Sequence, residues 1–292
     1  MRLRPLEAIN LATLSVLSAL TLWLSGRLQD PGGILIRYGL MAAFLGAVAL
    51  VVRRKAPLSP PLSVAVDFYP AAMIPVLYES LGPLIPAARG VVRDDLLIAA
   101  DRALFGLDPT VWLERFVRPW LTDFFSISYL TYYFIAIFLG GVLWRRDRGA
   151  GRRFIFTLTL CYLVSYAGYF LLPALGPRFA LAAEQKAVLE TTPISRAISS
   201  TLNDLEHTRF DVFPSGHTMI AVAVLLVAFR RARDVFWFLL PVAVCLVIST
   251  VYCRYHYVVD VLAGMLLAVL TVPLGDRLYD RLASDSRYRA RS

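Results

Sequence analysis

Residues 212–222 read VFPSGHTMIAV, in which a short polar turn leads directly into an apolar run. Proline suits the first turn of a helix, because the N–H that it lacks would have no helical partner there. No charged residue follows until Arg230, so this stretch predicts a helix that begins at the turn and continues into nonpolar surroundings. His217, one of three histidines among 292 residues, stands at the mouth of that helix.

The whole chain shares this apolar character. Hydrophobic residues make up 58% and charged residues 17%, whereas soluble domains average about 45–50% and about 25%. A helix needs about 20 apolar residues to cross the hydrocarbon of a bilayer. Segments of roughly that length lie near 8–25, 34–52, 62–83, 124–144, 154–173, 213–229, 235–253 and 255–275. The sequence therefore predicts an all-α, polytopic transmembrane helical bundle of about eight spans.

The net charge of +9 is distributed as a membrane topology signal. Basic residues gather in the short loops 53–55, 145–153 and 230–233 and at both ends of the chain. Cytoplasmic loops carry such an excess, so we expect both termini in the cytoplasm and a cell-membrane location. Anionic lipid headgroups, and not nucleic acid, are the polyanion that this pattern fits.

This topology brings distant polar residues to one side of the membrane. Arg178 follows the fifth span, His217 opens the sixth, and Arg254 and His256 lie between the seventh and eighth. All four are therefore expected on the extracytoplasmic face. The two long connections, 84–123 and 174–212, belong to the same face, and the first has the helical spacing of an interfacial amphipathic segment.

The residue types around these positions suit phosphate chemistry. His256 and Asp260 are four apart, so on a helix the carboxylate could fix the imidazole tautomer and leave its other nitrogen as a nucleophile. Ser215 and Gly216 would offer a hydroxyl and backbone N–H groups at the positive end of a helix, beside His217. The plainer alternative is a turn entering a helix, with His217 as an interface residue.

FPSGHT and YHYVVDVLAG resemble the second and third signature motifs of the type 2 phosphatidic acid phosphatase superfamily, which includes glucose-6-phosphatase and vanadium haloperoxidases. The family pattern is KxxxxxxRP, PSGH and SRxxxxxHxxxD, and the resemblance covers roughly residues 154–275. The second motif matches from Pro214 to His217, and the third at Ser249, His256 and Asp260.

The departures from the family pattern concern basic residues. Thr250 stands at the arginine position of the third motif, and of the first motif only Arg178 remains. These losses resemble the inositol phosphorylceramide synthase and sphingomyelin synthase branch, whose members transfer a phospho-headgroup between lipids. A phosphatase acting on a lipid phosphate or polyprenyl pyrophosphate stays an alternative, and a proton-coupled transporter is a more remote one.

The resemblance implies a role for each matching residue. His256 would attack phosphorus and form a phosphohistidine, Asp260 would orient it, and His217 would protonate the leaving oxygen. The remaining candidates are the phosphate-binding Arg178, Ser215, Gly216 and Arg254, and beyond them Arg209, Asp211 and Glu79. No cofactor or metal is expected, and the partners would be a lipid phosphate or phospholipid and a lipid hydroxyl acceptor.

The chain is expected to divide into three parts. Residues 1–123 form an N-terminal transmembrane region with the interfacial segment, 124–275 a catalytic transmembrane core, and 276–292 a basic cytoplasmic tail.

Overall fold

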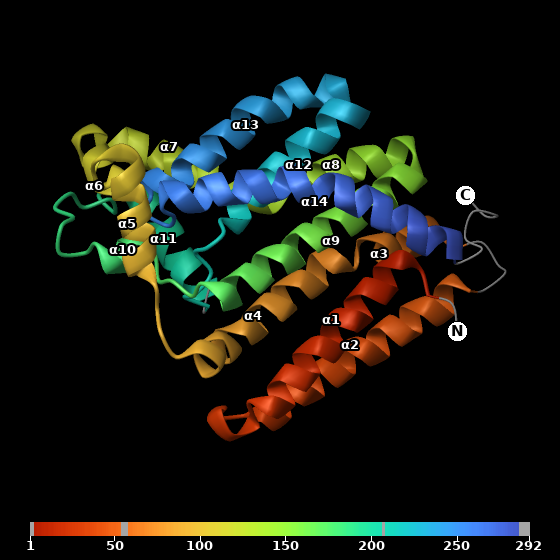
Figure 1. The fold of residues 1–292 in the computed structure, drawn as a ribbon. Coiled ribbons are helices and arrows are strands. Elements are labelled where there is room, and N and C mark those ends of the chain that lie inside the picture. The colour runs from red at the N-terminus through yellow and green to blue at the C-terminus, as the bar shows by residue number, and fades with distance from the viewer. Residues whose placement is uncertain (1–2, 54–57, 206–207, 286–292) are drawn as a thin grey trace.

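A computed structural model describes residues 3–53, 58–205 and 208–285, and within these ranges the chain forms helices and no β-strand (Figure 1). In chain order the elements are α1 (Pro5–Trp23), the 3-10 helix η1 (Ser25–Arg27), α2 (Pro31–Val52), α3 (Pro60–Phe68), α4 (Pro70–Arg89), α5 (Asp94–Phe105), α6 (Pro109–Trp112), η2 (Leu113–Phe116), α7 (Pro119–Leu130), α8 (Tyr132–Arg146), α9 (Arg148–Leu171), α10 (Pro177–Ala180), α11 (Pro193–Leu205), α12 (Gly216–Arg231), α13 (Arg233–Tyr252) and α14 (Val258–Asp285).

Each of the eight apolar segments corresponds to a helix or a broken pair of helices. The third segment is interrupted at Tyr69, between α3 and α4, and the fourth at Thr131, where α7 and α8 meet at 44°. In the described ranges six helices are long and apolar enough to cross a membrane, or seven if the bent pair counts as one span. The all-α polytopic bundle is confirmed, while α12, with 16 residues, falls short of a full span.

Helix α12 lies inside the bundle. It packs against α8, α9, α13 and α14, and the side chains of Met219, Ile220 and Val224 are fully buried. Gly264 of α14 allows the closest approach, since a Cβ there would lie 2.5 Å from the carbonyl oxygen of Ser215. The start of α12 is thus fixed against α14 by direct backbone contact.

The end of the bundle that carries the start of α1 and the end of α14 is held by a buried acid (Figure 1). Asp67, on α3, is 1% exposed and accepts hydrogen bonds from Arg4 (3.0 Å), Arg148 (2.8 Å) and Arg152 (3.0 Å). The indole N–H of Trp144 adds a fourth bond at 2.9 Å. A buried carboxylate needs such partners, so this network ties the start of α1 to α3, α8 and α9.

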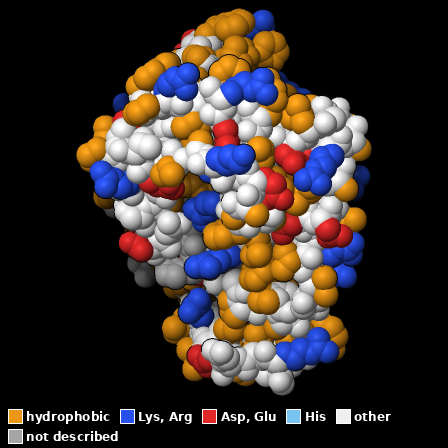
Figure 2. Space-filling view, turned by 90° about the vertical axis from the view of Figure 1, so that its left-hand side faces the viewer, with side chains coloured by type: hydrophobic (Ala, Val, Ile, Leu, Met, Phe, Trp, Pro, Cys, Tyr) orange, Lys and Arg blue, Asp and Glu red, His pale blue; other side chains and the backbone are white. Residues whose placement is uncertain are grey.

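The opposite end carries α5, α6, α10 and α11 (Figure 1). These short helices are formed by the two long connections predicted at 84–123 and 174–212. Figure 2 looks onto this end and shows acidic and basic side chains interspersed with apolar ones. Helix α14 continues to Asp285, so the described beginning of the predicted tail is helical.

Candidate active site

The two histidines of the motifs lie in direct contact. His217 is in the first turn of α12, and His256 is in the irregular link between α13 and α14. Nε2 of His256 lies 3.4 Å from Nδ1 of His217, and the side chains are 3% and 7% exposed respectively. Two imidazoles from segments far apart in the sequence therefore share one buried position.

The tautomer of His256 is set by a backbone carbonyl. Nδ1–H of His256 donates to the carbonyl oxygen of Val212 at 3.0 Å, which leaves the lone pair on Nε2. Burial lowers the pKa of His256 to about 4, so the ring is neutral at physiological pH. A neutral imidazole with a fixed tautomer and a free nitrogen is suited to nucleophilic attack.

Asp260, expected to hold the His256 ring, lies slightly too far away for that hydrogen bond. Its Oδ2 is 3.7 Å from Nδ1 of His256 and instead accepts the backbone N–H of Tyr257 at 2.9 Å. Within the described chain its Oδ1 is buried without a hydrogen-bond partner. The carboxylate therefore caps the start of α14 and lies beside the imidazole without a hydrogen bond to it.

His217 is enclosed by aromatic rings. The ring centroids of Tyr129 and Tyr132 lie 4.5 and 4.1 Å from that of His217. Nε2 of His217 is buried and has no hydrogen-bond partner in the part of the chain that the structure describes. Because an unsatisfied buried polar atom is costly, this nitrogen is available to a ligand.

At the start of α12, where the sequence predicted a phosphate seat, Ser215 forms hydrogen bonds within the protein. The hydroxyl of Ser215 accepts the N–H of Thr218 at 3.3 Å, and the N–H of Ser215 donates to the carbonyl of Asp260 at 3.1 Å. Gly216 packs so closely that a Cβ would lie 2.6 Å from the hydroxyl of Tyr169. Both residues shape the helix start, and neither is among the described residues that line the cavities beside the histidines.

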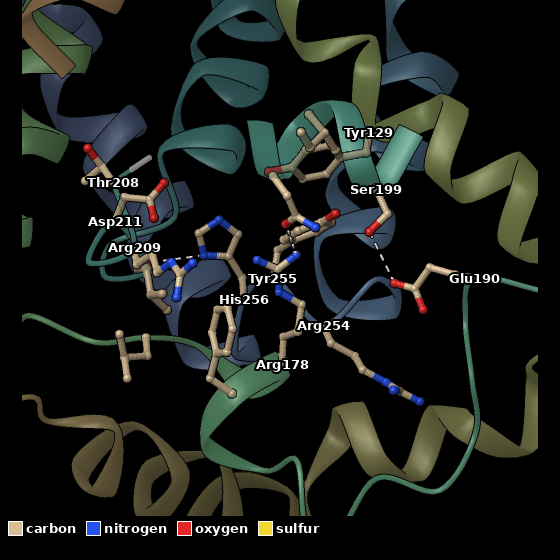
Figure 3. Close-up of a pocket in the computed structure, with 15 residues that line it drawn as sticks. Tyr129, Arg178, Glu190, Ser199, Thr208, Arg209, Asp211, Arg254, Tyr255 and His256 are labelled. Carbon is tan, nitrogen blue, oxygen red and sulfur yellow. Dashed lines mark hydrogen bonds between the residues drawn. The ribbon is translucent and has the colours of Figure 1, made fainter. Parts of the chain in front are cut away.

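A polar cavity of about 370 Å³ opens beside His256 (Figure 3). Arg178 and Arg209 line it, and their guanidinium carbons lie 4.7 and 5.7 Å from the ring centroid of Phe179. Nη1 of Arg178 also donates to Asn203 at 3.0 Å. These two arginines come from opposite ends of the 174–212 connection and place two positive charges in one cavity.

Arg254 lines the same cavity, but its charge is already paired. Its backbone has a φ of +64°, so the chain is irregular at this position. Nη2 donates to Glu114 at 2.8 Å and to the carbonyl of Ala187 at 2.7 Å. Its guanidinium points away from His256 (Figure 3), so Arg254 holds the link in place while Arg178 and Arg209 face the cavity.

Asp211 and Glu79 lie close to the pair. Asp211 accepts the hydroxyl of Tyr78 at 2.7 Å, and burial raises the pKa of its carboxyl. Glu79 lines a second, apolar cavity together with His217 and Asp211.

Helix α5 supplies site contacts that the sequence did not reveal. Asp101 accepts the backbone N–H groups of Val258 and Val259 at 3.0 and 2.8 Å, at the start of α14. Asp94 accepts the N–H of Gly176 at 2.8 Å and the hydroxyl of Tyr257 at 2.9 Å. The only sequence signal was two acids seven residues apart on an amphipathic helix, which does not show what they contact.

The chain belongs to the PAP2 superfamily, whose family model matches residues 95–274. That match begins within α5 and includes both histidines. The chain is also 24% identical over 183 residues to a PA-phosphatase related-family protein from Dictyostelium discoideum. The alignment covers 56% of this chain and 33% of the relative, so the chain spans about a third of that protein's length. No solved structure matches.

Proposed function

We propose that this protein is an integral membrane phosphotransferase that acts on a lipid phosphate or phosphodiester through a phosphohistidine on His256. Membership of the PAP2 superfamily supports lipid phosphate chemistry in general. The observation that carries the proposal is the contact of a tautomer-fixed His256 with His217 at the wall of an arginine-lined cavity.

The chemistry takes two steps. Nε2 of His256 attacks phosphorus, the bond from phosphorus to the lipid oxygen breaks, and protonated His217 gives its proton to that oxygen. His217 then takes a proton from an acceptor hydroxyl, whose oxygen attacks phosphorus as the P–N bond breaks. A correctly placed general acid contributes about 10²–10⁴ in rate. Arg178 and Arg209 would stabilise the charge on the phosphoryl oxygens.

The short distance between the His217 and His256 rings limits how the phosphoryl group can reach them. A nucleophile and phosphorus approach to about 3–3.5 Å before reaction, so a phosphate does not fit on the 3.4 Å line between the two imidazoles. The phosphoryl group would enter from the polar cavity, and the rings would separate as it binds.

The lining and volume of the polar cavity favour transfer of a headgroup over release of phosphate. Its lining also includes Ser199, Asn203 and Glu190, and its volume of about 370 Å³ exceeds that of a lone phosphate. Such side chains suit a hydroxyl-rich headgroup, as in inositolphosphotransferases. The alternative, a lipid phosphatase, is supported by the similarity to the PA-phosphatase related-family protein from Dictyostelium.

The activity can be tested with purified protein and a phospholipid labelled in its headgroup phosphate, with and without a hydroxyl-bearing lipid. A new labelled phosphodiester that depends on the acceptor supports the transferase, and free phosphate supports the phosphatase. Absence of both products would contradict the proposal. Loss of activity in EDTA would contradict the predicted metal-free chemistry.

We also propose that the site faces outside the cytoplasm in the cell membrane. The arginines around Asp67 lie at the end opposite the histidines, as the positive-inside rule requires for a bundle with cytoplasmic termini.

A further inference from the structure

A second cavity, of about 490 Å³, lies beside His217 and is mainly apolar. We call it the apolar chamber. Helices α4 and α8 each pack on α9, and the chamber occupies the space between them over α9. Its lining includes Ile74 of α4, Ile137 of α8 and Leu158 of α9. Ile137 is 54% exposed, so the wall reaches the surface that faces lipid in a membrane.

The apolar chamber and the polar cavity meet at the histidine pair. His217 lines the chamber, His256 lines the polar cavity, and the two rings are 3.4 Å apart. Asp211 lines both spaces and is held by Tyr78 of α4. A molecule that reacts at the pair would therefore have a charged region on one side and a nonpolar region on the other.

The chamber is long enough for a hydrocarbon chain. On α9 its lining runs from Phe154 to Tyr169, and fifteen residues of helix rise about 22 Å. One leaflet of the hydrocarbon core is about 15 Å deep. A chain lying along α9 would thus be covered by protein for more than the depth of a leaflet.

We infer that the apolar chamber holds a hydrocarbon chain of the lipid substrate while its phosphate lies at the His217–His256 pair. This inference rests on the proposed function. Helix α4 precedes residue 95, where the family match begins, so one wall of the chamber comes from outside the matched region. The N-terminal region of this chain would therefore select the lipid chain, and the PAP2 core would perform the chemistry.

The test uses a substitution that narrows the apolar chamber and leaves the histidines unchanged. Ala71 of α4 lines the chamber and is exposed, whereas its neighbour Ala72 is also exposed but is not among the lining residues. Turnover by Ala71→Trp and Ala72→Trp would be compared on dioleoyl and dihexanoyl phosphatidic acid. Because each displaced methylene weakens binding several-fold, Ala71→Trp should raise KM for the long-chain lipid about tenfold. The KM of Ala71→Trp for the short-chain lipid should stay within twofold of the value for the unmodified protein. The KM values of Ala72→Trp for both lipids should do the same.

A labelling measurement gives a readout that does not need turnover. Phosphatidic acid with a diazirine in the middle of one chain should label α4 and α8 peptides of the unmodified protein. That label should fall at least fivefold in Ala71→Trp and persist in Ala72→Trp. Labelling without turnover would leave the chamber standing and contradict the proposed function. Equal labelling of both variants, or equal KM changes for both lipids, would overturn the chamber assignment.

Discussion

At the residue scale, the site depends on where helix α14 begins. The spacing of His256 and Asp260 predicted one helical face, but α14 starts at Val258 and the preceding residues are irregular. The carboxylate therefore binds the N–H of Tyr257, and a carbonyl from Val212 holds the imidazole. The motifs identified the two histidines, because motif chemistry is local. The partner carbonyl could not be predicted, since it depends on how two remote segments pack.

Arg209 and Arg254 are expected to differ in role: Arg209 binds the phosphoryl group, whereas Arg254 stabilises the link between α13 and α14. Arg209→Gln should lower kcat/KM about a hundredfold, because one donor to the phosphoryl oxygens is lost. Arg254→Gln should mainly lower the thermal unfolding midpoint, since it leaves Glu114 without its buried partner. Kinetics and thermal unfolding of the two variants would check this. A larger loss of activity in Arg254→Gln than in Arg209→Gln would contradict these two roles.

The lowered pKa of His256 predicts that the activity persists at mildly acidic pH. Burial favours the neutral, nucleophilic ring, which persists until the pH falls towards the pKa of about 4. With a phosphodiester donor, which has no ionisation in this range, kcat/KM should show no decline between pH 7 and about pH 5 and should fall only at lower pH. A single-turnover pH profile measures this. A decline centred near 6.5, the ordinary histidine value, would show that the ring is not held neutral.

At the element scale, α5 is the least predictable part of the site. Its periodicity indicated an amphipathic helix at the interface, and such a pattern does not distinguish a bilayer from a protein surface. The structure packs it against α14, where Asp101 caps the helix that follows His256. The long apolar helices, in contrast, were predictable because the bilayer sets their length.

Removal of the Asp101 cap should disturb the site from a distance. Asp101→Ala should reduce stability by about 0.5–2 kcal/mol, the usual range for a lost cap, and should lower kcat more than it raises KM. Asp108→Ala is the matched control, because Asp108 pairs with Arg102, which is exposed. Chemical denaturation and steady-state kinetics would test both variants. Equal effects of the two substitutions on stability and kcat would contradict the positioning role of α5.

At the scale of the whole molecule, the bundle has two chemically distinct ends. The distribution of charge in the sequence predicted basic loops on one side and the polar site residues on the other. The helix bounds agree with the predicted segments to within a few residues at most ends. The helix α12 departs from the predicted count, because a helix enclosed by others need not match the thickness of the bilayer.

Topology is open to direct labelling. Val188, 64% exposed near the histidine end, and Arg145, exposed at the other end, are suitable cysteine positions. In intact cells an impermeant thiol reagent should modify Val188→Cys and leave Arg145→Cys unlabelled until the membrane is permeabilised. The reverse pattern would place the active site in the cytoplasm.

The central claim is that His256 carries the phosphoryl group between the two steps. Purified protein would be mixed with a phosphate-labelled lipid donor, quenched in alkali within milliseconds and digested for mass spectrometry. We predict an acid-labile phosphate on the peptide that contains His256, absent in His256→Ala and persisting longer in His217→Ala. Label that remains in His256→Ala, or turnover of that variant at the unmodified rate, would contradict the account.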